Sequence, residues 1–483
     1  MDVTYYVSRE DIQGILPEII LLVAALVILS LEMLPKRRPS LMLAVSLLGL
    51  MSGSIAVLQH GGERSVFSGM LSLSAYTMFL DLLYMAVGIA SLVIAQNYLE
   101  RRGGSLRGEY YALILFAVIG MMLMTRANDL VIVFLGLELL SLSLYVLVGF
   151  LRHDIYSNEG GLKYLLLGAF ATGFFLFGAA LIYGTTGTTN LEQMAVTIGS
   201  GGVLSQPILS LGIGLLIVGF AFKVAIVPFH MWSPDVYQGA PTTITAFLCT
   251  APKAAGFGAL LKVFIVGFSP ESDAWVGLLW ILAVLTMTVG NLSALVQSDV
   301  KRMLAFSSVA HAGYLLIGVL VFDTRGIASV LFYLIVYAAM NLGAFAIVSI
   351  VEKGEMGLAL EDYRGLAARH PWLSAVLSLF MISLAGFPPT AGFTAKYAVF
   401  SAAISKGHIW LVVIAVLNTL VSVIYYVRLI VNMYMQKEKT ELATFVSPNT
   451  MLLLAFLAAV VILFGLMPQW LLENARQAAT VFS

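Results

Sequence analysis

The sequence predicts an all-α polytopic membrane protein with about 14 transmembrane helices, including two inverted five-helix repeats that each contain a broken helix. Three observations carry this prediction: the composition, the long apolar runs and a matched pair of interruptions. Hydrophobic residues make up 60% of the 483 residues and charged residues 11%, whereas an average soluble domain is about 25% charged. So little polar surface cannot cover a soluble core of this size.

The apolar runs supply the predicted spans. Runs of about 18 or more apolar residues mark membrane-spanning helices, and the chain holds about fourteen. The first begins too late and runs too long for a cleaved signal peptide. The spans are expected near 12–34, 41–59, 76–99, 110–124, 129–150, 157–183, 208–236, 242–268, 275–296, 303–321, 326–350, 372–405, 410–434 and 448–466.

Basic residues predict the orientation of these spans. Loops after odd-numbered spans hold about 14 Lys and Arg residues, against about 6 in the other loops and the two tails. Because cytoplasmic loops carry the excess of positive charge, both termini are expected on the periplasmic or outer side of a bacterial cytoplasmic (inner) membrane.

Two predicted spans are interrupted by proline. The seventh is broken near 227–234 and the twelfth near 386–390. Proline removes a backbone donor and ends or kinks a helix, and at membrane depth the freed carbonyls must be buried in protein or face water. Each break therefore predicts a polar site inside the membrane.

The two breaks occupy matching positions of an internal repeat. Each lies in the fourth of five spans, and an odd number of spans inverts the second set. We predict three N-terminal helices in 1–109, a first repeat in 110–268, its inverted copy in 275–434, and a last helix and tail in 435–483.

Basic side chains inside the spans are candidate proton carriers. Buried charges in membranes cost at least about 2.5–3.5 kcal/mol on insertion scales and usually line a polar pathway or pair with one another. Lys223, Lys253 and Lys396 lie too deep to reach a headgroup, so we expect proton carriage, with a structural ion pair as the alternative. The other basic residues within spans, Lys163, Lys262 and Arg428, lie near enough to an interface for snorkelling.

Three further polar residues join this set. Glu138, near the centre of the fifth span, is the expected carboxylate partner of Lys223. His230 follows Lys223 by two helical turns, which places both on one face only if the helix continues through Pro228. His311 lies mid-span, and a proton-relay role and a structural role both remain open.

The chain carries no recognisable redox or nucleotide site. Its one cysteine, Cys249, excludes a disulfide or four-cysteine cluster within the chain, and we find no dinucleotide fingerprint, P-loop or haem motif. No metal site is expected, and any redox chemistry is assigned to another chain.

Three segments carry a family resemblance. FKVAIVPFHMWSPDVYQGAPTTITAFLCTAPKAAGF (222–257), SDVKRMLAFSSVAHAGY (298–314) and LAGFPPTAGFTAKYAVF (384–400) resemble the antiporter-like membrane subunits of respiratory complex I, especially the subunit N family of NADH–quinone oxidoreductase. The resemblance covers essentially the whole chain.

The resemblance implies roles for the polar residues. Glu138 matches the glutamate of the fifth helix, Lys223 its partner on the broken seventh, and Lys253 the central lysine of the eighth. Lys396 matches the exit-side lysine of the broken twelfth helix. His230 and Lys163 match further polar positions of the proposed proton route.

The resemblance also implies partners and cofactors. Neighbouring antiporter-like and small membrane subunits and the lipid bilayer are the expected partners, with no nucleic acid. No cofactor is expected in this chain; FMN, iron–sulfur clusters, NADH and quinone are expected in partner subunits. The alternatives are a subunit of a multisubunit cation/proton antiporter or of a related membrane-bound hydrogenase or dehydrogenase, and the ion, H⁺ or Na⁺, stays open.

Overall fold

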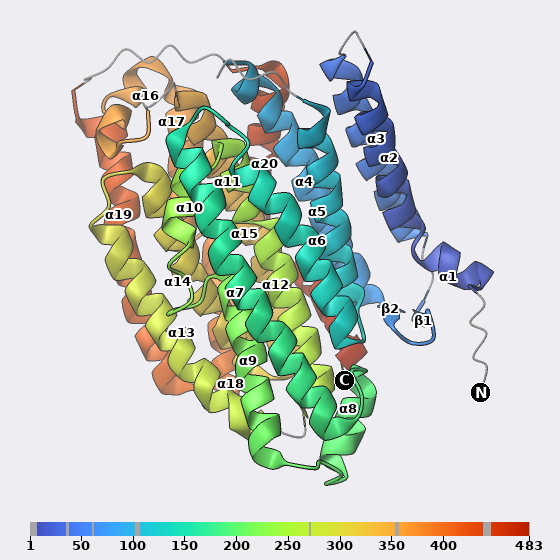
Figure 1. Cartoon of the computed structure of the whole chain (residues 1–483). Helices are drawn as coiled ribbons and strands as arrows, with labels where there is room; N and C mark the ends of the chain where they lie inside the picture. The colour runs from blue at the N-terminus through green and yellow to red at the C-terminus, as the bar shows by residue number, and fades with distance from the viewer. Residues whose placement is uncertain are drawn as a thin grey trace.

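The chain folds almost entirely into helices that run roughly parallel through one body (Figure 1). The computed structural model describes residues 7–34, 38–59, 62–101, 107–269, 272–352, 357–437 and 446–482. Within them, twelve helices are long and apolar enough to cross a membrane. The remaining two predicted spans correspond to α2, which is 17 residues long, and to the pair α17 and α18, of 15 residues each. The predicted fold class is therefore confirmed.

The unbroken spans follow the predicted order. They are α2 (Leu16–Glu32), α3 (Pro39–Leu58), α4 (Ala75–Arg101), α5 (Gly108–Arg126), α6 (Leu130–Val148), α7 (Ile155–Thr186), α13 (Ser272–Leu295), α14 (Val300–Val321), α15 (Thr324–Val351), α19 (Ile409–Met435) and α20 (Pro448–Leu466).

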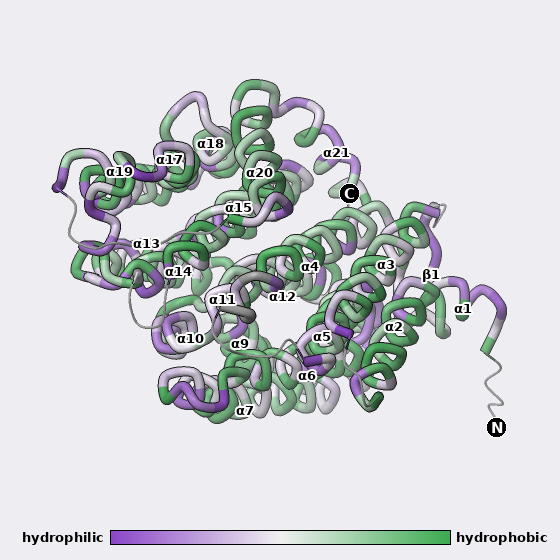
Figure 2. Tube along the Cα trace, turned by 90° about the horizontal axis from the view of Figure 1, so that it is seen from above, coloured by the Kyte–Doolittle hydropathy of each residue, from purple (hydrophilic) through white to green (hydrophobic). Residues whose placement is uncertain are grey.

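Short elements join or flank the spans. A two-stranded antiparallel hairpin, β1 (Arg64–Val66) and β2 (Leu71–Leu73), connects α3 to α4. The others are α1 (Arg9–Gly14), α8 (Leu191–Gly199), η3 (Leu360–Tyr363), α16 (Leu366–Arg369), α21 (Gln469–Ala479) and η4 (Thr480–Phe482). Viewed along the helices, α2 and α3 lie at one edge of the body and α17, α18 and α19 at the opposite side (Figure 2).

Both predicted breaks are present. The seventh span divides into α9 (Gln206–Val224) and α10 (Ser233–Gly239), and the twelfth into α17 (Pro371–Ala385) and α18 (Ala391–Ser405). Each first half ends on a left-handed residue, Ala225 in one and Gly386 in the other. The two interruptions thus share their local geometry as well as their place in the repeat.

The eighth span carries a third break, which the sequence analysis missed. It divides into α11 (Thr242–Leu248), α12 (Ala251–Lys262) and a π-helical turn, η1 (Val263–Gly267). Thr250 leaves the helical conformation with φ −110° and ψ −88°. Pro252, two residues into α12, is the one signal of this break in the sequence, because proline suits the first turn of a helix.

The internal repeat is also visible in backbone hydrogen bonds. Asp129 caps the start of α6, and the backbone beside it pairs with residues 189–191 through bonds of 3.0 and 2.8 Å. Asp299 caps the start of α14 by accepting from the Arg302 N–H, and its neighbours pair with residues 358–360 through two bonds of 2.8 Å. The two aspartates therefore occupy equivalent positions, one in each five-helix set.

One sequence-based placement was wrong, and one open alternative is excluded. Arg126, counted among the loop residues, is 1% exposed and ends α5 inside the body. Lys262, for which snorkelling was an open alternative, is 4% exposed and donates to Ser72 Oγ at 2.6 Å. Five basic residues used for the orientation, Lys36, Arg37, Arg102, Lys353 and Lys439, lie outside the described residues.

Candidate functional site

Lys223 occupies the last turn of α9, where the helix ends before the break. The side chain is 5% exposed, and its Nζ donates to Ser141 Oγ of α6 at 3.0 Å. The freed backbone is satisfied inside the protein, since the Trp232 indole donates to the Phe222 carbonyl at 2.9 Å. The break therefore presents an ammonium to α6, and the Phe222 carbonyl beside it finds its partner within the protein.

Glu138 lies one helical turn before Ser141 on α6. Its charge acts on Lys223, but the two residues form no ion pair among the described contacts, and Ser141 receives the lysine instead. Glu138 Oε1 is buried and lacks a hydrogen-bond partner in the described part of the chain. The expected direct packing of the two side chains is thus corrected to an approach through Ser141.

Lys253 lies in the first turn of α12, just after the unpredicted break. It is 2% exposed, and its Nζ donates to both the carbonyl and the hydroxyl oxygen of Ser308 at 2.5 Å each. The same ammonium lies 5.7 Å from the centre of the Tyr337 ring. Lys253 thereby joins the first five-helix set to α14 of the second.

His311 lies one turn beyond Ser308 on α14 and is enclosed by aromatic side chains. Its Nδ1 is 2.7 Å from Tyr333 Oη, and its Nε2 is 3.2 Å from Tyr426 Oη. Tyr426 Oη also shares a short hydrogen bond with Ser307. Both ring nitrogens are therefore engaged with hydroxyl groups, which can donate or accept a proton.

Lys396 lies in the second turn of α18, facing the end of α17 across the break. Its Nζ donates to the carbonyls of Leu384 and Ala385 at 3.2 and 3.0 Å. These are among the last carbonyls of α17, which have no partner within the helix. The ammonium also lies 4.8 Å from the centre of the Tyr314 ring, so it is held by neutral groups on each side.

These residues follow one another through the middle of the body. Contacts connect α6 to α9 through Ser141 and Lys223, α12 to α14 through Lys253 and Ser308, and α14 to α18 through the Tyr314 ring and Lys396. Sequence reasoning missed the hydroxyl groups between the charged residues, because serine and tyrosine are common in apolar helices and their spacing gave no signal. The missed residues are Ser141, Ser308 and Tyr426; the spacing of Tyr333, Tyr337 and Asn341 places them on one helical face, which favours packing as their role.

Lys163 lies away from this line. Its side chain is 41% exposed and pairs at 2.6 Å with both Glu159 and Asp235. Asp235 also pairs with Arg302 at 2.7 Å. Lys163 therefore belongs to a partly exposed ion network that ties α7 to α10 and α14.

His230 does not share a helical face with Lys223, because α9 ends at Val224 and α10 begins only at Ser233. Its ring lies 6.4 Å from that of Phe306. Nδ1 is buried and has no hydrogen-bond partner among the described residues. The conditional placement from spacing therefore fails at the break.

A cavity of about 340 Å³ opens beside the start of α11, at the end of the molecule that carries the 298–301 connection. Asp299, Lys301 and Glu352 are among its lining residues. Lys301 donates to the Ala240 carbonyl at 2.7 Å, and Glu352 accepts a short hydrogen bond from Thr242, the first residue of α11. The polar cavity therefore lies next to the start of α11, the short helix that precedes α12 and Lys253 in the chain.

The described residues include no group of three or more His, Cys, Asp or Glu side chains placed to hold a metal ion. Cys249 is a buried free thiol.

Comparison with known proteins identifies a matching family and several relatives. The family described as "NADH:quinone oxidoreductase/Mrp antiporter, TM" matches residues 127–422. The chain is 46% identical to NADH-quinone oxidoreductase subunit N of Trichlorobacter lovleyi, over 97% of each chain. It is 44% identical to subunit N 2 of Rhizobium meliloti, over 96% of each.

Among solved structures, a chain of respiratory complex I from Thermus thermophilus with bound aureothin is similar. That chain is 34% identical, with a TM-score of 0.81 over 95% of this chain and 98% of the other. A chain of the Mrp complex from Dietzia shares the fold, with a TM-score of 0.85 over 98% and 97% of the two chains, at 21% identity.

Proposed function

The chain belongs to the NADH:quinone oxidoreductase/Mrp antiporter family, and within it to the subunit N group, and we propose that it moves protons along its central line of lysines. Electron transfer from NADH to quinone in other subunits drives this movement. The chain takes its place beside other membrane subunits of such a complex, as its structural relatives do.

One observation carries the proposal. Lys223, Lys253 and Lys396 are each at most 5% exposed, and each donates to neutral hydroxyl or carbonyl oxygens. A lysine tied to a carboxylate would leave a stranded buried charge when it lost its proton, which is costly. A lysine held by neutral oxygens leaves none, so it can release and regain a proton in place.

The route begins at the polar cavity beside α11 and reaches Lys253. From Lys253 the proton passes by Ser308 to His311 and its two tyrosines, and on to Lys396. Glu138 and Lys223 form the control pair at the α6 end of the line, because a change in the charge of Glu138, one helical turn from Ser141, alters the field at Lys223. Water molecules complete the steps that no direct hydrogen bond spans.

No redox chemistry is assigned to this chain. One cysteine cannot supply a four-cysteine cluster, and we assign FMN, the iron–sulfur clusters, NADH and quinone to partner subunits, as the family resemblance implies. The proposed location is a bacterial cytoplasmic membrane with both termini on the periplasmic side, as the loop charges favour. The cavity beside α11 then opens to the cytoplasm, where protons are taken up.

Replacing Lys223 tests the proposal. In Lys223→Ala, NADH-driven proton uptake into inverted membrane vesicles should fall by about tenfold or more, since a rate falls tenfold for each 1.4 kcal/mol added to the barrier. Lys406→Ala is the matched control, because Lys406 is 46% exposed and outside the central line. Undiminished uptake by an assembled Lys223→Ala complex would refute the control role of the Glu138–Lys223 pair.

Gentle solubilisation separates the alternatives. The chain should co-migrate with iron–sulfur and flavin proteins. Co-migration with antiporter subunits alone, or with nickel-containing subunits, would instead favour the antiporter or the hydrogenase. Uptake measured in sodium-free and sodium-containing buffer should be equal if the ion is H⁺.

A further inference from the structure

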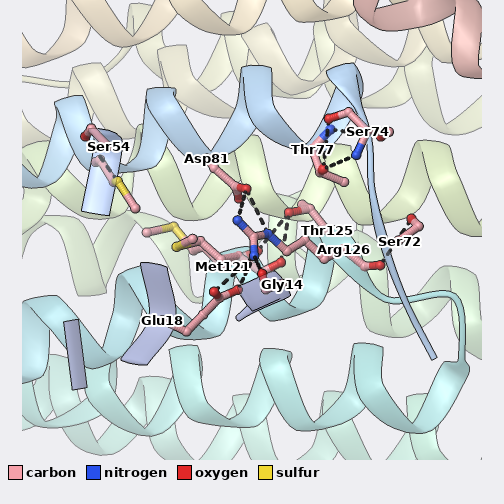
Figure 3. A network of polar contacts seen from close by, with 12 residues as sticks. Gly14, Glu18, Ser54, Ser72, Ser74, Thr77, Asp81, Met121, Thr125 and Arg126 are labelled. Carbon is pink, nitrogen blue, oxygen red and sulfur yellow. Dashed lines mark hydrogen bonds and ion pairs between the residues drawn. The ribbon is translucent and has the colours of Figure 1, made fainter. Parts of the chain in front are cut away.

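A second group of buried charges lies outside the central line, where α2, α4 and α5 meet (Figure 3). Arg126, at the end of α5, reaches Glu18 at 2.7 Å and Asp81 at 2.7 Å. It also donates to the Gly14 carbonyl at 3.0 Å. All three charged side chains are less than 10% exposed.

The two oxygens of the Asp81 carboxylate differ in their contacts. Oδ2 receives both contacts from the Arg126 guanidinium. Oδ1 is buried and has no hydrogen-bond partner among the described residues, although leaving a buried acceptor unpaired costs about 1–3 kcal/mol. An unpaired carboxylate oxygen in this position calls for a water molecule or a proton.

A cavity supplies the space for that water. It has a volume of about 150 Å³ and is lined by Asp81, Arg126, Thr77 and Ser74, reaching the exposed Glu63 beside β1. At about 30 Å³ per molecule in the liquid, such a volume holds roughly five waters. The cavity therefore extends from the surface at the β1–β2 hairpin to the buried carboxylate.

Lys262 completes the group. Its ammonium donates to the Arg126 carbonyl at 2.8 Å and to Ser72 Oγ at 2.6 Å. Two carboxylates and two cations make the group neutral when all four are charged. It stays neutral if Lys262 gives its proton to Asp81, because an ammonium becomes an amine while a carboxylate becomes a carboxylic acid. The group has no net charge before or after the transfer, so the transfer avoids the cost of a lone buried charge.

We propose that Asp81 is a proton-binding site that is reached through this cavity and exchanges its proton with Lys262. In the exchange, an N–H bond of the Lys262 ammonium breaks and an O–H bond forms at Asp81 Oδ1, with water carrying the proton between the two groups. Glu192 and Tyr84 are the other titratable groups whose charges act on this pair. The site lies at the hairpin face of the molecule and is separate from the line through Lys253 and Lys396.

Cysteine accessibility tests the cavity in the assembled complex. In a Cys249→Ala background, Thr77→Cys should react with Ag⁺ in chloride-free buffer from the same side of the membrane as the rim variant Glu63→Cys. The reaction is followed as protection from later alkylation in denaturant. Ser91→Cys, also on α4 and buried but outside the cavity lining, should react at least about tenfold more slowly. Equal slow reaction of Thr77→Cys and Ser91→Cys would overturn the open cavity.

Infrared titration tests the proton site in the purified complex. A pH-dependent carboxylic acid band should disappear in Asp81→Asn and move to a different pH in Lys262→Gln, and it should remain in Glu63→Gln. Spectra of Asp81→Asn that match the parent protein would overturn the assignment. If Asp81→Asn does not assemble, Asp81→Glu should retain a shifted band, and an unchanged band would count against the site.

Discussion

Ser141 and His311 occupy the same position in the two five-helix sets. Each follows by twelve residues the aspartate that caps its helix, Asp129 on α6 and Asp299 on α14. Ser141 accepts a hydrogen bond from Lys223, while His311 is bonded to two tyrosines. Equivalent positions of the fold thus hold a hydrogen-bond acceptor for a lysine in the first set and an imidazole bonded to two hydroxyl groups in the second.

Removing the Ser141 hydroxyl should slow proton movement. Ser141→Ala deletes the oxygen that receives Lys223 at 3.0 Å, and a hydrogen bond to a charged group contributes about 1.5–3 kcal/mol. We expect NADH-driven proton uptake to fall by about tenfold. The control is Ser143→Ala, whose hydroxyl bonds only the Leu139 carbonyl of its own helix among the described contacts; equal losses in both variants would contradict a role for Ser141.

Removing the Tyr333 hydroxyl should slow proton uptake, because this hydroxyl contacts His311. Tyr333→Phe removes the 2.7 Å contact to Nδ1 and leaves that nitrogen buried and unpaired, at a cost of about 1–3 kcal/mol. Proton uptake should fall several-fold. Tyr76→Phe is the comparison, since Tyr76 is equally buried and loses a 2.7 Å bond to the Gly258 carbonyl. If proton uptake falls as much in Tyr76→Phe as in Tyr333→Phe, the loss is explained by disturbed packing and not by the contact with His311.

A methyl group at Gly386 should displace Lys396. Gly386 has φ +89°, and a Cβ there would lie 3.0 Å from Lys396 Cδ and 3.3 Å from Nζ. Gly407 has φ +83° and open space around its Cβ position, so both alanine variants carry the same left-handed backbone cost of about 1–2 kcal/mol. Gly386→Ala should lose proton uptake and Gly407→Ala should retain most of it, and the reverse order would refute the contact.

Breaking the buried ion group should destabilise the chain. Arg126→Met leaves Glu18 and Asp81 without their cation, and breaking a buried pair in this way costs about 3–5 kcal/mol. The detergent-solubilised complex should unfold at a temperature several degrees lower, as measured by thermal unfolding. Arg325→Met removes an exposed arginine from the start of α15 and should leave the unfolding temperature almost unchanged.

The sequence predicted the elements whose signals are local. Apolar length located every span, and the proline clusters located two breaks, since proline acts on its own helix. The third break was missed because Pro252 lies where a helix would accept it. The loop placement of Arg126 failed because its partners, Glu18 and Asp81, lie on helices far from it in sequence. Depth along a span is readable from the chain, whereas side-chain pairing across helices depends on packing.

The roles assigned to the site residues stay predictions, and the structure adds hydrogen-bond connections that the sequence did not show. Lys253 stood out by burial depth, but Ser308, which receives it, looks like any small residue of an apolar helix. Direct contact between Glu138 and Lys223 was expected from charge alone, and the intervening Ser141 could not be inferred without the helix register. Charged residues in membranes are conspicuous in a sequence, and the hydroxyl groups that serve them are not.

The paired backbone beside Asp129 and Asp299 closes both five-helix sets in the same way. Because each set holds five spans, the pairing faces one side of the membrane in the first set and the opposite side in the second. One five-helix unit therefore closes the same way whichever side its first helix enters from.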